Sequence, residues 1–234
     1  MNLLLLSTFV ERMLPYERTS FIFLNKHHTA FWDHFMMLYS GKILWIPLCV
    51  AFLVLAFYKT KWQKGLLFIV CFALLICLCD QAAAGIIKPF FCRLRPTHHP
   101  DFMTQVLTVD NYRGGRYGFI SAHAANGFGV VMFLSLVYRR LLFTVVLLSW
   151  ALITCYSRIY LGVHFITDVI GGMILGSLLG FLVYCLFKYL RISLFSLSTD
   201  SSESPVYSKW HSNLIMMVIG VTVLVNTVIA LCAQ

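Results

Sequence analysis

Three short polar clusters lie between long apolar runs, and their side chains are of the kinds that bind anions and move protons. The clusters are Lys88 to Pro96, Phe119 to His123, and Ser157-Arg158 followed by His164 and Asp168. In a chain that spans a membrane, ionisable groups within spans or at their ends are costly, so they indicate function. Lysine and arginine can hold an anion, a histidine can move a proton or attack, and an aspartate can steer a histidine.

The third cluster contains a histidine and an aspartate at helical spacing. His164 and Asp168 are four residues apart at the start of an apolar run, so a helix would place them on one face. An aspartate that accepts a hydrogen bond from one imidazole nitrogen fixes the tautomer and leaves the other nitrogen with a free lone pair. The alternative is an ordinary polar pair at the end of a span.

Basic side chains in the first and third clusters could converge on one anion. Arg158 offers a planar donor fork that matches phosphate oxygens, although a lone arginine at the end of a span also serves as a membrane anchor. Lys88 and Arg95 are seven residues apart, and Pro96 stiffens the chain after them. The alternative for this segment is a basic loop at the membrane surface.

The second cluster lies where another span is expected to begin. The N-terminus of a helix presents free N–H groups and a positive dipole end, which favour an anion near Ser121. His123 could then donate a proton to a leaving oxygen. The alternative has Ser121 as a helix cap and His123 as a packed residue at the interface.

The composition is that of an integral membrane protein. The chain has 234 residues, of which 60% are hydrophobic and 12% charged, whereas an ordinary soluble domain is about half apolar and a quarter charged. The net charge of +9 lies largely in short loops. Nucleic acid is excluded as a partner because the chain has no soluble basic domain to bind it. The sequence says nothing about oligomeric state.

Apolar runs predict an all-α bundle of about six transmembrane helices. The runs cover about 43–59, 65–87, 119–138, 141–156, 164–188 and 212–232. Residues 1–42 alternate apolar and charged positions at helical spacing, which predicts an amphipathic segment lying at the membrane surface. The predicted organisation is therefore 1–42 at the interface, a core of five spans at 43–189, a polar loop at 190–211, and a final span at 212–234.

Two further features bear on how the helices are arranged. Gly172, Gly176 and Gly180 form a ridge of small residues that suits close contact between two helices. With six spans, all three polar clusters lie at one membrane face, and the loops at the other face carry most of the remaining lysines and arginines. The positive-inside rule makes that second face cytoplasmic and predicts that the clusters face outward.

Taken together, the clusters describe a phosphate pocket with a nucleophile and an acid. At this point the sequence resembles the type 2 phosphatidic acid phosphatase superfamily of lipid phosphatases. The first motif of that family, Lys-x6-Arg-Pro, is matched in full at 88–96, and the third, Ser-Arg-x5-His-x3-Asp, in full at 157–168. The second, Pro-Ser-Gly-His, here reads Ile120-Ser121-Ala122-His123.

The resemblance implies a mechanism in two steps without a metal or cofactor. His164 would attack phosphorus, Asp168 would orient it, and His123 would protonate the leaving oxygen and later activate water. The resemblance also implies a set of phosphate-binding groups, with backbone N–H groups near the start of the helix: Lys88, Arg95, Ser121, Ala122 and Arg158.

The resemblance also implies a membrane lipid phosphate as substrate, reached from the bilayer of a bacterial cytoplasmic membrane with the site facing the periplasm. Additional donors in the site loop favour a headgroup with more than one anionic unit; they are Arg93, His98, His99, Arg113 and Arg116. Lipid A is ranked first as substrate, with undecaprenyl diphosphate and phosphatidylglycerol phosphate as alternatives.

Other classes of protein remain open from the sequence. A phospholipid-binding or transport protein without turnover would use the lysines and arginines but not the two histidines, and a vanadium haloperoxidase would share the pocket in a soluble chain. A purely structural bundle would use the polar groups to join helices. Asp80 and Gln81 are either partners of Lys88 or Arg95, or a polar contact within the bundle.

Overall fold

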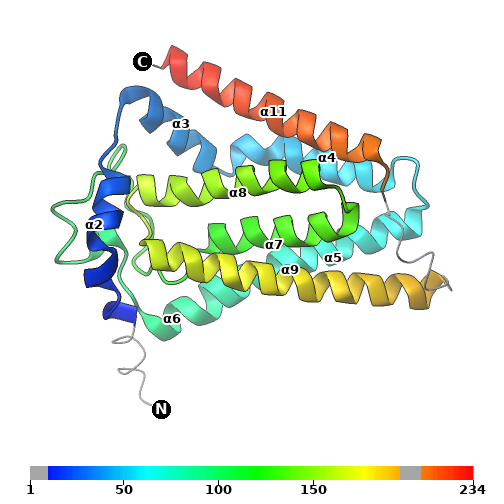
Figure 1. Ribbon diagram of the computed structural model, residues 1–234, viewed down its shortest axis with the longest axis horizontal. Coiled ribbons are helices and arrows are strands. Elements are labelled where there is room, and N and C mark those ends of the chain that lie inside the picture. Colours follow the sequence, from blue (N-terminus) through cyan, green and yellow to red (C-terminus); the bar gives the residue numbers. More distant parts are fainter. Residues whose placement is uncertain (1–9, 196–206, 234) are drawn as a thin grey trace.

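The computed structural model describes residues 10–195 and 207–233, and this part of the chain is helical without a β-strand (Figure 1). The longer helices are α2 (Leu14–Asn25), α3 (Ala30–Ser40), α4 (Ile46–Phe57), α5 (Trp62–Asp80), α7 (Ala122–Tyr138), α8 (Leu141–Tyr160), α9 (Ile166–Phe195) and α11 (Lys209–Cys232). Shorter helical segments are η1 (Ile43–Trp45), the π-helix η2 (Gln81–Ile87), α6 (Lys88–Phe91) and η3 (Pro96–His98).

The described helices confirm the predicted all-α membrane bundle. Four segments are long and apolar enough to cross a membrane, namely Trp62–Phe91, Leu141–Tyr160, Ile166–Phe195 and Lys209–Cys232. The shorter apolar helix α7 lies among them. Among the described residues, the number of spans is four by length and composition, or five if α3 and α4 together count as one span, and α7 is a shorter apolar helix.

The helix α3 and the helical segment Ile43–Phe57 form a bent pair that is apolar enough to count together as one further candidate span. They meet at an angle of 65°, and α3 packs against α8 and α11. The helix α3 ends because Gly41 takes an extended conformation, and its apolar face buries Phe35 and Tyr39.

Residues 196–206 of the polar loop predicted at 190–211 lie outside the described residues, whereas its first and last parts are described. The helix α9 continues to Phe195, beyond the predicted end at 188. Arg191 lies in this added part of the helix and is buried. Lys188, where the predicted span ends, is therefore not the end of the helix.

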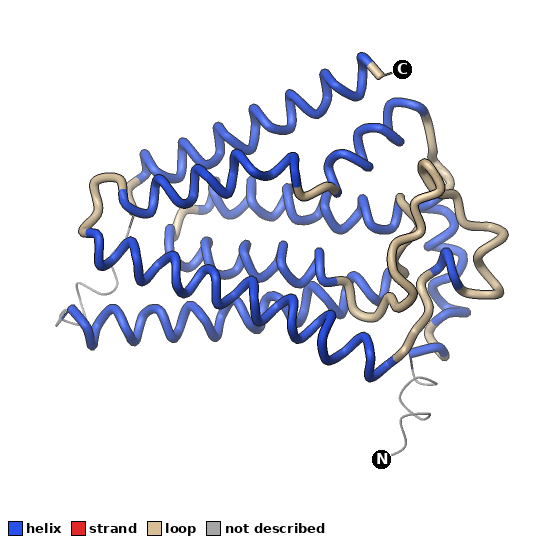
Figure 2. The backbone as a smooth tube through the Cα atoms, turned by 180° about the vertical axis from the view of Figure 1, so that it is seen from behind, coloured by secondary structure: helices blue, strands red, loops and turns tan. Residues whose placement is uncertain are grey.

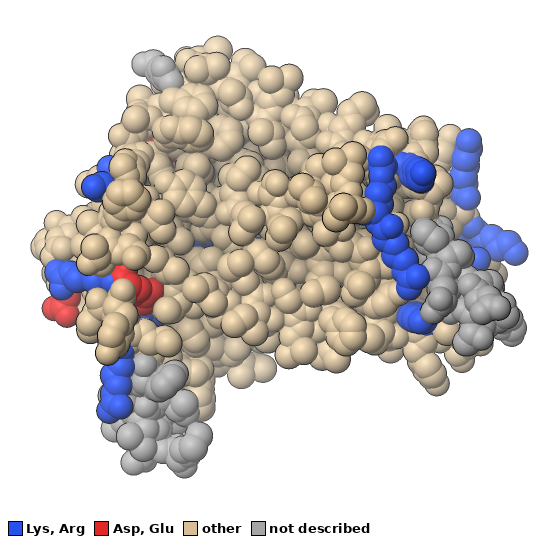
Figure 3. All heavy atoms as spheres, viewed as in Figure 1, with Lys and Arg blue, Asp and Glu red and all other residues tan. Residues whose placement is uncertain are grey.

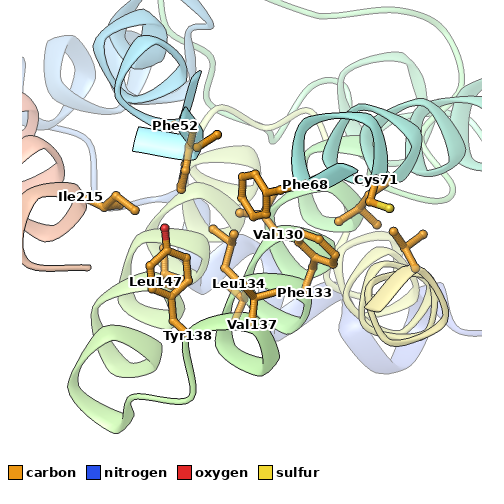
Figure 4. Packing of buried hydrophobic residues seen from close by; sticks show 14 of the residues in the cluster. Phe52, Phe68, Cys71, Val130, Phe133, Leu134, Val137, Tyr138, Leu147 and Ile215 are labelled. Carbon is orange, nitrogen blue, oxygen red and sulfur yellow. The ribbon is translucent and has the colours of Figure 1, made fainter. Parts of the chain in front are cut away.

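The core of the bundle is built around α7, which packs against α5, α8 and α9. Phe68 from α5, Phe133 from α7 and Leu147 from α8 belong to one buried apolar cluster, together with Phe52 and Ile215 (Figure 4). Many other large apolar side chains are exposed on the outside of the bundle, as expected for helices that face lipid.

The predicted glycine ridge is present and sets the distance between α7 and α9. A Cβ atom on Gly172, Gly176 or Gly180 would overlap backbone atoms of α7, including the carbonyl oxygens of Ser121 and Ala125. Only glycine allows the two backbones to approach so closely. The start of α7 and the start of α9 are thereby held side by side.

One end of the bundle carries α2 and the long loop between α6 and α7 (Figures 1 and 2). The side chain of Asn25, at the end of α2, donates to the carbonyl oxygens of Leu107 and Tyr160 over 3.1 and 2.7 Å, and it accepts from the Leu107 N–H over 2.8 Å. This buried amide therefore joins α2, the loop and the end of α8.

Lysine and arginine side chains gather at the opposite end of the molecule (Figure 3). The connections between α4 and α5 and between α7 and α8 lie there (Figure 1); they carry Lys59, Lys61, Arg139 and Arg140, and Lys64 follows in the first turn of α5. The three polar clusters lie at the end that carries α2, so the two ends of the bundle differ in the chemistry of their side chains.

Candidate active site

The second polar cluster forms the start of α7. Ser121 is the N-cap of this helix, and its hydroxyl accepts from the Ala124 N–H over 3.4 Å. The Ser121 N–H donates to the carbonyl oxygen of Asp168 over 2.9 Å, which ties the start of α7 to the first turn of α9. Ala122 is the first residue of a right-handed helix, so alanine adopts the required backbone without strain where the family motif has glycine.

The structure brings His164 and Asp168 together in the buried interior. The Nδ1 atom of His164 lies 3.4 Å from Oδ2 of Asp168, and the two side chains are 1% and 0% exposed. The same oxygen accepts from the Phe165 N–H over 3.0 Å. Because Nδ1 faces the carboxylate, Nε2 is the ring nitrogen that is free to act on a ligand.

A cavity of about 510 Å³ collects most of the other predicted site residues. Its wall includes Lys88, Arg95, Ala122, His123 and Arg158. By contrast, Ser121, His164 and Asp168 are almost completely buried. The predicted residues thus form one group that lines the cavity, which is rich in cations, and a second group outside its wall that contains the His–Asp pair.

Each cation of the cavity is oriented by its own part of the fold. The π-helix η2 runs directly into Lys88, and such segments occur frequently at functional sites. The Nε atom of Arg95 donates to the carbonyl oxygen of Tyr117 over 3.1 Å. Arg158 donates to the hydroxyl of Ser40 and, over 3.3 Å, to the hydroxyl of Tyr112.

The electrostatics of the site favour an anionic ligand. Burial, and then the positive charges of Arg95, Arg158 and Lys88, lower the pKa of His164 well below its usual range. Burial and the charge of Arg158 also lower the pKa of the Arg95 guanidinium. Burial acts to raise the pKa of Tyr112, but the hydrogen bond from Arg158 and the positive charges of Arg158 and Arg95 together outweigh it, and the pKa is lowered. A bound phosphate would relieve this crowding of positive charge.

Arg93 and Glu17 form a buried network behind the His–Asp pair that the sequence did not predict. Arg93 is 1% exposed and donates to Oδ1 of Asp168 over 2.7 Å and to Oε1 of Glu17 over 2.5 Å. Glu17 also accepts from the N–H and the hydroxyl of Thr167 over 2.8 and 2.7 Å. The helix α2 is thereby joined to the first turn of α9.

This network changes the role expected for Arg93, which the sequence grouped with donors for the lipid headgroup. It is neither exposed nor part of the cavity wall, because its guanidinium is enclosed by two carboxylates. His99 is similarly paired with Glu11, at 3.3 Å. The pairing of Arg93 with Glu17 and Asp168 is visible only in the structure, and the sequence carries no signal for it.

The break between α3 and α4 adds residues that were not predicted. Ser40, Gly41 and Lys42 line the cavity beside His123 and Arg158. They do so because α3 ends at Ser40, beside the cavity, and the chain turns there toward α4. Within the described ranges, no group of three or more His, Cys, Asp or Glu side chains is placed to hold a metal ion.

Comparison with known proteins supports the family that the three motifs indicate. The family model described as "PAP2 superfamily" matches residues 65–192. A lipid A 4'-phosphatase of Porphyromonas gingivalis is 40% identical over 199 residues, which cover 85% of this chain and 84% of the relative. A lipid A 4'-phosphatase of Bacteroides thetaiotaomicron is 34% identical and covers 80% of this chain and 81% of the relative.

A solved structure shares the fold. The crystal structure of a transmembrane PAP2-type phosphatidylglycerolphosphate phosphatase from Bacillus subtilis matches with a TM-score of 0.56 and 22% identity, over 80% of this chain and 93% of that one. Fold and site together thus define the class of protein: a helical membrane bundle with a cation-lined cavity at one end. The chain belongs to the PAP2 superfamily. The resemblance and the predicted enzyme class, a phosphate ester hydrolase, are confirmed.

Proposed function

We propose that the protein removes a phosphate from lipid A, most specifically the 4'-phosphate, in a cytoplasmic membrane. The observation that carries the proposal is the pair of lipid A 4'-phosphatases at 40% and 34% identity over at least 80% of the chain. The cation-lined cavity of about 510 Å³ supports it, because the cavity extends beyond the space that a phosphoryl group needs. The bilayer would deliver the substrate, and no nucleic acid is involved.

The proposed first step uses His164 as the nucleophile. Its Nε2 would attack phosphorus while the bond between phosphorus and the lipid oxygen breaks, and His123 would give that oxygen a proton. Asp168 accepts from Nδ1 and would stabilise the ring as its charge rises. The product of this step is a phosphohistidine and a lipid that carries a hydroxyl group.

In the second step His123 would take a proton from water, whose oxygen attacks the phosphohistidine and releases inorganic phosphate. The charge on the phosphoryl oxygens would be neutralised by Lys88, Arg95 and Arg158, which line one cavity. The N–H groups at the start of α7, including that of Ala122, would donate to the same oxygens. Ser121 would act mainly by capping the helix, since its hydroxyl accepts from Ala124.

We propose further that the site faces the periplasm. The support is the difference between the two ends of the bundle, because the end opposite the site gathers lysine and arginine (Figure 3). Loops rich in these residues stay on the cytoplasmic side. The site end also contains cations, but those of the cavity have a second explanation as ligands for the phosphate.

A phosphate-release assay tests the substrate. Purified full-length protein is incubated in detergent with lipid A, undecaprenyl diphosphate, phosphatidylglycerol phosphate or phosphatidate, with His164→Ala as the inactive control. We expect the highest kcat/KM with lipid A and, by mass spectrometry of the product, loss of the 4'-phosphate. Faster turnover of another lipid would reject lipid A as the main substrate. Stoichiometric binding without phosphate release from any lipid would indicate a transport or binding protein instead.

A further inference from the structure

A polar pair lies in the same cavity as the cations, deeper along the helices. Asp80 is the last residue of α5, eight residues before Lys88, so it lies roughly 10 Å further along the helix axis. The Nδ2 atom of Asn126 donates to Oδ1 of Asp80 over 2.8 Å. Both residues line the cavity of about 510 Å³.

This pair has more hydrogen-bond acceptors than the donor groups within it can satisfy. The Oδ1 atom of Asn126 is buried and has no hydrogen-bond partner, and a buried acceptor of this kind is costly. An ionised carboxylate accepts only, and Asp80 receives one of its possible hydrogen bonds, from Asn126. Both acceptors would be satisfied by O–H or N–H groups of a ligand.

The position of the pair points to the leaving group rather than to the phosphate. His123 and Asn126 are three residues apart on α7 and therefore share one face of the helix. Since His123 is proposed to protonate the leaving oxygen, the group attached to that oxygen extends along this face toward Asn126. The Asp80 carboxylate would repel a phosphate, which the cations at the other end of the cavity attract.

We infer that Asp80 and Asn126 form a subsite for hydrogen-bond donors on the leaving group, and that this group is a sugar with hydroxyl and amide N–H groups. The inference rests on the proposed phosphatase function and selects among its substrates. A polyprenyl chain has no donor groups to offer, and diacylglycerol esters have only acceptors. A glucosamine unit offers several donors close to the phosphorylated oxygen.

The alternative is that the pair only joins α5 to α7. Asn226 provides a matched control, because it is also buried, donates through Nδ2 to the carbonyl oxygen of Phe35 over 3.1 Å, and leaves its Oδ1 without a partner. It lies on α11 and does not line the cavity. Loss of a structural contact alone should affect Asn126→Ala and Asn226→Ala in the same way.

The test compares kcat/KM for lipid A with kcat/KM for dioleoyl phosphatidate, whose leaving group has no donor. For Asn126→Ala and Asp80→Ala we expect the ratio of the two values to fall about 10–100-fold, the effect typical of a lost hydrogen bond to a charged or buried acceptor. Asp80→Asn should give a smaller fall, because an amide oxygen still accepts. Asn226→Ala should lower the melting temperature and leave the ratio unchanged.

Equal losses on both lipids for the Asp80 and Asn126 variants, or a change in melting temperature alone, would overturn the subsite. The proposed function can fail separately, if the wild-type protein cleaves phosphatidylglycerol phosphate but not lipid A. The same variants are then measured with phosphatidylglycerol phosphate, whose leaving group carries a glycerol hydroxyl. An unchanged ratio to phosphatidate would overturn the inference in that case as well.

Discussion

Replacement of Arg93 by methionine should damage both the stability of the protein and its chemistry, and a second change should separate the two effects. Arg93 neutralises Glu17 and Asp168 at 2.5 and 2.7 Å, and its side chain is fully buried. Removal of one partner from a buried ion pair typically costs about 3–5 kcal/mol, because the remaining charge is left unpaired. Two carboxylates are left here, so we expect a loss near the upper end of that range.

The effect on chemistry should appear mainly in kcat. Arg93 holds Oδ1 of Asp168, which leaves Oδ2 facing His164 and the Phe165 N–H. Without the guanidinium, the carboxylate loses one of its fixed partners. Partners that orient metal-binding histidines are typically worth about 10–100-fold in activity, and by analogy we expect a loss of kcat of that size for Arg93→Met. The KM should change little, because the cations that line the cavity are untouched.

The double variant Arg93→Met/Glu17→Met distinguishes the two effects. It removes the second unpaired carboxylate, and replacement of a buried ion pair by apolar residues is often neutral for stability. We therefore expect the melting temperature in detergent to recover in part while kcat stays low. The single variant Glu17→Gln should show the converse, with a lower melting temperature but nearly unchanged kcat, since Arg93 still holds Asp168.

The measurements are thermal unfolding in detergent and the initial rate of phosphate release from lipid A. If Glu17→Gln lowers kcat as much as Arg93→Met does, the network acts through overall packing and the orientation of Asp168 is not its role. Recovery of kcat in the double variant would refute the reasoning in the same way.

The remaining predictions concern the two histidines, the independence of the activity from metal ions, and the membrane topology. His164→Ala should abolish both turnover and any covalent phosphoenzyme. In His123→Ala the rate of phosphate release from lipid A should fall about 10²–10⁴-fold, and part of it should return with an aryl phosphate, whose leaving group needs little protonation. Phosphate trapped on His123 would reverse the two roles. The lowered pKa of His164 should keep its ring neutral as the pH falls through 6.5, which NMR of labelled histidine can follow with His164→Ala as the assignment control; a titration near 6.5 would contradict this. Activity should persist in strong chelator, and vanadate should inhibit it; loss in chelator with recovery on one divalent ion would remove the proposed mechanism. Single cysteines at Arg113 and Lys61 should be labelled from opposite sides of the membrane, and labelling from the same side would reject the topology.

The polar clusters could be predicted as parts of one site because their spacing carries geometric information. The four-residue interval between His164 and Asp168 and the start of an apolar run at Ser121 each constrain where a side chain lies. The glycine ridge on α9 has the same property, and the structure places it against the backbone of α7. Periodicity within one segment was sufficient for these features.

Contacts between segments far apart in the chain could not be predicted in this way. Glu17 and Arg93 are separated by 76 residues, and nothing in the spacing of either indicates the other. Asp33 on α3 likewise accepts a hydrogen bond from the Tyr160 hydroxyl over 2.6 Å, although the two residues are 127 positions apart in the chain. Local patterns report which faces are polar, but they do not report what covers them.

The glycine ridge also bears on how the protein tolerates change. The separation of α7 from α9 is set where Gly172 and Gly176 meet main-chain atoms and the small side chain of Ala124, so no large side chain acts as a spacer there. The helices that carry His123 and Asp168 therefore keep their spacing whatever residues cover the lipid-facing surface. Substitutions can therefore accumulate on that surface during evolution, and the bilayer can differ in thickness, without a change in the distance between the parts of α7 and α9 that carry His123 and Asp168.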